Sequence, residues 1–201
     1  MRYYFNQILF SLLLTLLFNR CAQVGQLTGG KKDTTPPKLV NATPANASLN
    51  FNSSQIILQF DEFVQLEDLT NQLIITPSLK TLPEITSEGK KIKIIIKKEE
   101  LKSNSTYHFS FGSSIADMHE GNTVKNFEYV FSTGNFIDTL KINGLLTDAF
   151  NNNPVPGALI ALYTNFKTDS LPFNVVPEFI TKTEDNGTFQ INYLPSTTFR
   201  V

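Results

Sequence analysis

The stretch TYHFSF, residues 106–111, decides the fold class of this chain. Its three aromatic side chains occupy alternate positions, and its histidine and serine occupy the positions between them. Side chains point to opposite faces of a β-strand with a period of two, whereas a helix would spread these aromatics around its axis. The pattern therefore predicts a strand with one buried, aromatic face and one polar face.

The same alternation recurs along the chain, most plainly in KIKIIIK (residues 91–97), where isoleucine and lysine alternate over most of the segment. The strands predicted in this part are residues 38–41, 55–60, 73–76, 84–87, 91–97, 106–111 and 128–132. About seven strands in about one hundred residues is the count of an immunoglobulin-like β-sandwich. The segment LKSNSTY (101–107) further resembles the tyrosine corner of such sandwiches, which gives Tyr107 a structural role.

A second group of β-type segments begins near Thr139. Strands are expected at residues 141–146, 159–163, 180–183 and 188–193, separated by the turn-forming sequences NNNPVPG and EDNG. The predicted fold class is all-β, with an Ig-like sandwich over residues 38–134 and a second β-sandwich unit over residues 139–201. The final TTFRV reads as a further strand, so we expect this unit to be truncated and more protein to follow.

Residues 1–20 have the form of an export signal. Arg2 precedes an apolar run at residues 8–18 that is too short to span a bilayer comfortably. Cys21, the only cysteine, follows where the bacterial lipoprotein signal, which this segment resembles, places its acylated residue. We predict a lipid anchor on Cys21 and a polar tether up to residue 37. An uncleaved signal anchor and a free buried thiol are the alternatives, because Asn19 and Arg20 replace the usual small residues.

Composition narrows the classes of partner. The chain has 17 Lys and Arg residues against 18 Asp and Glu residues, so it has no basic surface to neutralise phosphates and nucleic acid is not expected as a partner. A single cysteine also excludes an intramolecular disulfide, so a packed hydrophobic core has to supply the stability.

No set of residues predicts catalysis, and no cofactor is expected. The two histidines, His108 and His119, lack the spacing of a zinc site and are predicted to lie on the surface. Asp61, Glu62 and Glu67 are read as solvated acids, because nothing in the sequence fixes the separation that a glycosidase pair requires. The sequence also lacks the GxSxG motif of a serine hydrolase.

The loop DMHEGN (residues 117–122) contains the best candidate for a metal site. Asp117, Glu120 and Asn122 offer oxygen ligands of the kind that calcium prefers. Their spacing differs from that of an EF-hand, and the same residue types form ordinary turns between strands. Both interpretations, a calcium site and a plain turn, stay open at this point.

Several segments together resemble a known family. The sequences GGKKDTTPPKLV (29–40), FDEFV (60–64), TYHFSFGSSIADMHEGN (106–122) and YVFSTGNFIDTL (129–140) resemble the Ig-like lipoproteins of Bacteroidota, whose domain is similar to the Ig-like domain of bacterial S-layer proteins. The second unit, through GLLTDAFNNNPVPGALIALY (144–163) and TEDNGTF (183–189), resembles carboxypeptidase-regulatory-like repeats of transthyretin-like fold. The resemblance implies an envelope protein with no catalytic residues to carry over.

Three tripeptides look like the acceptor pattern of Bacteroidota O-glycosylation. They are DTT, DTL and DSL, with the acceptors Thr34, Thr139 and Ser170. The predicted positions, in the tether, at the boundary between the units and in a loop, are places where a bulky polar modification is tolerated.

We therefore expect a non-enzymatic, lipid-anchored protein of the outer membrane whose Ig-like domain is a structural or adhesive module. The alternative is a glycan-binding or protein-binding component of an outer-membrane complex that depends on calcium. Residues 22–25 lack the acidic residues that would indicate export to the cell surface, so the periplasmic and surface faces both remain open.

Overall fold

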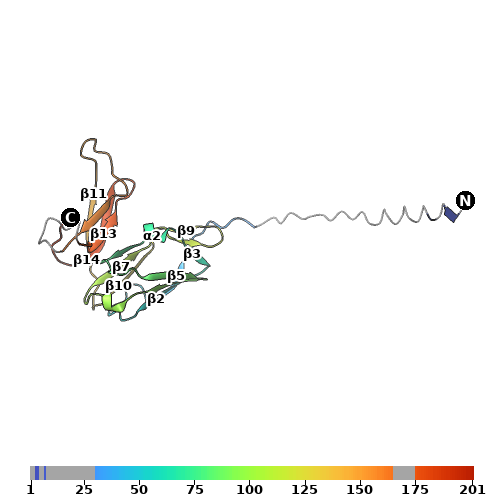
Figure 1. The fold of residues 1–201 in the computed structure, drawn as a ribbon, viewed down its shortest axis with the longest axis horizontal. Helices are drawn as coiled ribbons and strands as arrows, with labels where there is room; N and C mark the ends of the chain where they lie inside the picture. Colours follow the sequence, from blue (N-terminus) through green and yellow to red (C-terminus); the bar gives the residue numbers. More distant parts are fainter. Residues whose placement is uncertain (1–2, 5–6, 8–29, 165–174) are drawn as a thin grey trace. The chain divides into compact units, whose positions relative to one another are not determined.

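The computed structural model describes residues 3–4, 7, 30–164 and 175–201 (Figure 1). Residues Met1–Lys32 and Asp33–Val201 are separate units, and every feature below belongs to the second of them. This unit is nearly all β, which confirms the predicted fold class. In the part of the chain that the structure describes, no helix is long and apolar enough to cross a membrane. The predicted sites Cys21 and Ser170 lie outside the described residues.

Two antiparallel sheets form the Ig-like sandwich. The first has the order β1-β2-β6-β5 and consists of β1 (Leu39–Thr43), β2 (Gln55–Phe60), β6 (Lys91–Ile95) and β5 (Glu84–Glu88). The second has the order β10-β7-β4 and consists of β10 (Glu128–Ser132), β7 (Thr106–Ser110) and β4 (Ile74–Thr76). Each of these strands overlaps a predicted segment, and β2, β6, β7 and β10 were predicted from their alternation.

The core lies between the two sheets. The inward residues that are fully buried include Ile56, Leu58 and Phe60 from β2, Ile92 and Ile94 from β6, and Tyr107, Phe109, Tyr129 and Phe131 from β7 and β10. The strand register brings core side chains of the second sheet side by side, because Phe109 is paired with Ile75 on one side and with Tyr129 on the other. Burial of each large apolar side chain contributes about 1.5–3 kcal/mol, which compensates for the missing disulfide.

The tyrosine corner is present as predicted. The Tyr107 hydroxyl accepts a hydrogen bond from the backbone N–H of Lys102 at 2.8 Å. This bond ties the turn that precedes β7 to the ring that fills the centre of the core.

A small third sheet and two short helices were not predicted. The sheet has the order β3-β8-β9 and consists of β3 (Val64–Leu66), β8 (Ile115–Asp117) and β9 (Thr123–Val124). The helices are α2 (Leu69–Gln72) and the 3-10 turn η1 (Lys98–Glu100). These elements have two to four residues, which is too few to show an alternation or a helical period.

Among the residues that the structure describes, the second part of the chain contains two strand pairs. β11 (Leu140–Leu145) pairs with β14 (Thr188–Leu194), and β12 (Leu159–Leu162) pairs with β13 (Phe179–Lys182). They enclose their own cluster of buried residues, Leu162, Phe179, Ile191 and Leu194. Gly144 lies under the Phe189 ring so closely that a Cβ at position 144 would be 2.7 Å from it.

This second part packs on the outer face of sheet β10-β7-β4. Thr76, His108 and Val130 point away from the sandwich core, yet each is at most 8% exposed. The Tyr193 ring of β14 lies 5.0 Å from the His108 ring, centroid to centroid. The prediction that His108 lies on the surface is therefore wrong, because a period of two identifies the outer face of a strand but not what covers it.

Hydrogen bonds and one ion pair join the two parts. Ser78 N–H donates to the Glu178 carbonyl at 2.7 Å, and Lys102 Nζ lies 3.1 Å from Glu178 Oε1. Thr106 Oγ1 donates to Asp138 Oδ2 at 2.9 Å and accepts from Asp138 N–H at 2.8 Å. The connection between the Ig-like part and the second part is thus fixed to β7 by side-chain bonds.

Candidate functional site

The loop from Asp117 to Asn122 joins β8 to β9 and contains the predicted calcium ligands. The Asp117 carboxylate is 1% exposed and lies inside the loop. Its Oδ1 accepts hydrogen bonds from the backbone N–H groups of His119 (2.8 Å), Glu120 (2.6 Å) and Gly121 (3.2 Å), and its Oδ2 accepts one from Asn122 (2.7 Å). The loop is therefore wound around a single carboxylate.

These bonds determine the protonation of Asp117. Burial raises the pKa of its carboxyl group, but the N–H groups of Glu120, Asn122, His119 and Gly121 lower it by more, and the pKa is about 2. Asp117 is consequently ionised at neutral pH, and peptide N–H dipoles stabilise its charge.

The structure also tests whether the predicted metal ligands come together. Ligand atoms of Asp117, His119 and Glu120 lie within 4.8 Å of one another, with His119 and Glu120 exposed. The Asn122 amide instead donates to the Asp33 carbonyl at 3.2 Å. Because both Asp117 oxygens already accept backbone hydrogen bonds, the geometry accounts for the turn without a cation. The calcium site stays a prediction.

Two of the other acids near this loop, Asp61 and Glu67, have structural partners. Asp61 Oδ1 accepts the Lys38 N–H at 2.8 Å, where the chain enters β1, and Glu67 Oε1 accepts from the Gln65 amide at 2.9 Å. Burial raises the pKa of Glu62, and the negative charge of Asp117 raises it further. Asp61 thus fixes the backbone at the start of β1, and Glu67 positions a side chain of β3 from just beyond the end of that strand.

Two of the predicted glycosylation acceptors lie in the described part. Thr34 and Thr139 are both exposed. The Asp33 carboxylate accepts the Thr35 N–H at 2.8 Å, and Asp138 is bonded to Thr106. The two aspartates of these tripeptides therefore order the backbone beside each acceptor, and glycosylation itself stays a prediction.

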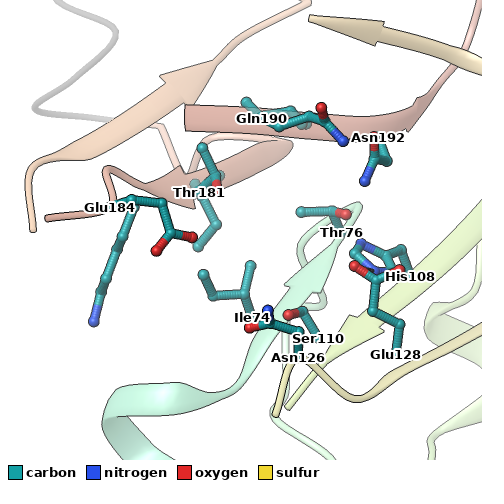
Figure 2. A pocket seen from close by; sticks show the side chains of 13 residues that line it. Ile74, Thr76, His108, Ser110, Asn126, Glu128, Thr181, Glu184, Gln190 and Asn192 are labelled. Atoms are coloured by element: carbon teal, nitrogen blue, oxygen red, sulfur yellow. Dashed lines mark hydrogen bonds and ion pairs between the residues drawn. The ribbon is translucent and has the colours of Figure 1, made fainter. Parts of the chain in front are cut away.

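A cavity of about 360 Å³, which the sequence analysis did not predict, lies between the outer face of sheet β10-β7-β4 and strands β13 and β14 (Figure 2). His108 Nε2 lies 3.3 Å from Glu128 Oε1 at one side of it, within ion-pair distance. Nevertheless Nε2 is buried and has no hydrogen bond of acceptable geometry within the described chain. The signal that was present in the sequence is the row of polar and β-branched residues on the outer face of β4, β7 and β10.

The sandwich matches a known family of proteins. Residues 33–133 match the family model of the bacterial Ig-like domain. The match covers both sheets of the sandwich and the Asp117 loop, and proteins with this domain are generally non-catalytic. A search of curated proteins finds no match.

Proposed function

Because the chain belongs to the bacterial Ig-like domain family, we propose that it is a non-enzymatic envelope protein, anchored in the outer membrane by a lipid on Cys21. Its Ig-like domain is a structural or adhesive module that the tether up to residue 37 separates from the bilayer. The membrane is then its first partner, through the lipid.

The observation that carries this proposal is the fixed connection between the two β parts. The bonds of Ser78 and Lys102 to Glu178, and of Thr106 to Asp138, hold the second part against the outer face of sheet β10-β7-β4. Contacts of this kind restrict the relative motion that domains on a free linker would have, and a restricted orientation suits a structural or adhesive module. The sequence features of the export signal and Cys21 support the anchor.

Metabolic labelling tests the anchor. Labelled palmitate is supplied to a Bacteroidota host that expresses the wild type, Cys21→Ala or the matched control Ala22→Ser. We expect label on the wild type and the control and none on Cys21→Ala. Absence of label from all three proteins would mean that the chain is a signal-anchored or secreted β-sandwich instead of a lipoprotein. If the wild type is labelled, its accessibility to protease on intact cells assigns the membrane face.

Adhesion and catalysis are tested separately. Cells that bind a host or glycan surface equally well with and without the gene would leave only the structural role. Hydrolase activity that survives purification and is abolished by Glu62→Gln or Glu120→Gln would overturn the non-enzymatic assignment.

A further inference from the structure

The cavity between the outer face of sheet β10-β7-β4 and strands β13 and β14 has the dimensions of a ligand site. Its volume of about 360 Å³ falls within the range of small-molecule pockets, about 300–1,000 Å³. Most of its lining lies on strands, which hold side chains more firmly than loops do. We propose that this cavity binds a neutral, polyhydroxylated ligand of the size of a mono- or disaccharide.

Six of the thirteen residues that line the cavity carry uncharged hydroxyl or amide groups. They are the hydroxyls of Thr76, Ser110 and Thr181 and the amides of Asn126, Gln190 and Asn192. Figure 2 shows Gln190 and Asn192 on one wall and Thr76 and Ser110 on the facing wall. Hydroxyls and amides both donate and accept, as the hydroxyls of a sugar do, so the two walls match such a ligand from both sides.

The charges of the cavity argue against an ionic ligand. Lys182 Nζ donates to the Asn71 carbonyl at 2.9 Å, and no arginine occurs among the lining residues that the structure describes, so an anion would find no guanidinium to bind it. The two carboxylates, Glu128 and Glu184, lie at opposite ends of the cavity in Figure 2 and form no paired cation site.

The second observation is the buried His108 Nε2, which lies 3.3 Å from Glu128 Oε1 but makes no well-aligned hydrogen bond in the described chain. His108 is 8% exposed. A ligand group that enters the cavity would give this nitrogen a well-aligned hydrogen bond. A ligand hydroxyl beside Nε2 and Glu128 Oε1 would bond to both. Contact with His108 lowers the pKa of Glu128, so this acceptor stays ionised.

The amide wall is already arranged for binding. Gln190 Nε2 donates to Asn192 Oδ1 at 2.8 Å, so the two side chains hold each other on one face of β14. The pair still offers the Gln190 carbonyl oxygen and the Asn192 amide N–H groups. Ordering these groups in advance reduces the entropy lost on binding.

The test adds sugars stepwise to the full chain and follows the NMR signals of the side-chain amides. Glucose, galactose, N-acetylglucosamine and maltose are the probes. We expect saturable shifts of the Asn126, Gln190 and Asn192 signals with at least one of them. Gln190→Leu should weaken binding about tenfold, the loss of a hydrogen bond to the ligand. Lys141→Ala, an exposed position on β11 outside the lining of the cavity, is the control and should bind like the wild type.

Three outcomes overturn the proposal. They are the absence of saturable shifts with all four sugars, equal binding by the wild type and Gln190→Leu, and preference for glucuronate over glucose. Gln190 is exposed, so the variant keeps the fold, and the backbone spectrum of each variant verifies this. The outcome is independent of the lipid anchor.

Discussion

The rings of Phe51 and Phe131 stack with their centroids 3.8 Å apart in the core of the Ig-like domain. Phe131 also stacks on the tyrosine-corner ring of Tyr107 at 5.3 Å. Phe131→Ala should therefore lower the free energy of unfolding by about 3–5 kcal/mol. Phe150 is 98% exposed, and Phe150→Ala should change the free energy of unfolding by less than about 0.5 kcal/mol. Urea denaturation measures both, and equal losses would contradict the assigned core.

Tyr129 makes the stability of the sandwich sensitive to alkali. Burial raises the pKa of its hydroxyl to about 12 from an ordinary value of 10.0, and the hydroxyl donates to the Pro44 carbonyl at 2.9 Å. Because the folded pKa is raised, the stabilisation is complete below pH 10 and is lost as the pH rises towards 12. Tyr129→Phe should flatten this part of the pH profile, and an unchanged slope would show that other groups cause it.

Asp117 has the opposite pH dependence. Its folded pKa of about 2 is below the ordinary 3.8, so its stabilisation is present above pH 4 and is lost as the pH falls towards 2. Asp117→Asn should lower the melting temperature at neutral pH, and the difference from the wild type should shrink in that acid range. Asp185 is exposed, and Asp185→Asn is the control variant.

A variant of Asp117 also decides the calcium question. We expect the melting temperature of the wild type to be the same with calcium and with a chelator, because backbone N–H groups already occupy the Asp117 oxygens. A calcium-dependent rise that disappears in Asp117→Ala would instead establish the metal site.

Two glycines of the second part form a matched pair. Gly187 and Gly157 both have positive φ, 77° and 67°, but only Gly187 faces backbone, where a Cβ would lie 2.5 Å from the Leu146 carbonyl oxygen. Gly157→Ala should lower the free energy of unfolding by about 1–2 kcal/mol because of the left-handed backbone alone. Gly187→Ala should lower it clearly more, because its Cβ would also collide with backbone. Chemical denaturation compares them, and equal costs would mean that the backbone at Leu146 moves aside.

The sequence predicted all seven strands of the two main sheets, most clearly those whose side chains alternate over five or more residues, and it predicted the tyrosine corner. It did not reveal β3, β8 or β9, which are too short for a period to be visible. For the Asp117 loop it identified the residues but not their arrangement, since the four N–H groups converge on the carboxylate only once β8 and β9 are paired. The burial of His108 was missed because it depends on β14, which follows far along the chain.

The bonds between Thr106 and Asp138 also determine how tension would travel through the molecule. A pull on the second part reaches Asp138 before the end of β10, and Asp138 passes it to Thr106 at the start of β7. β7 is the middle strand of its sheet, paired on both sides with β10 and β4. Stretching would therefore load two ladders of hydrogen bonds together, so the strand that comes last in the sandwich is not the first to peel away.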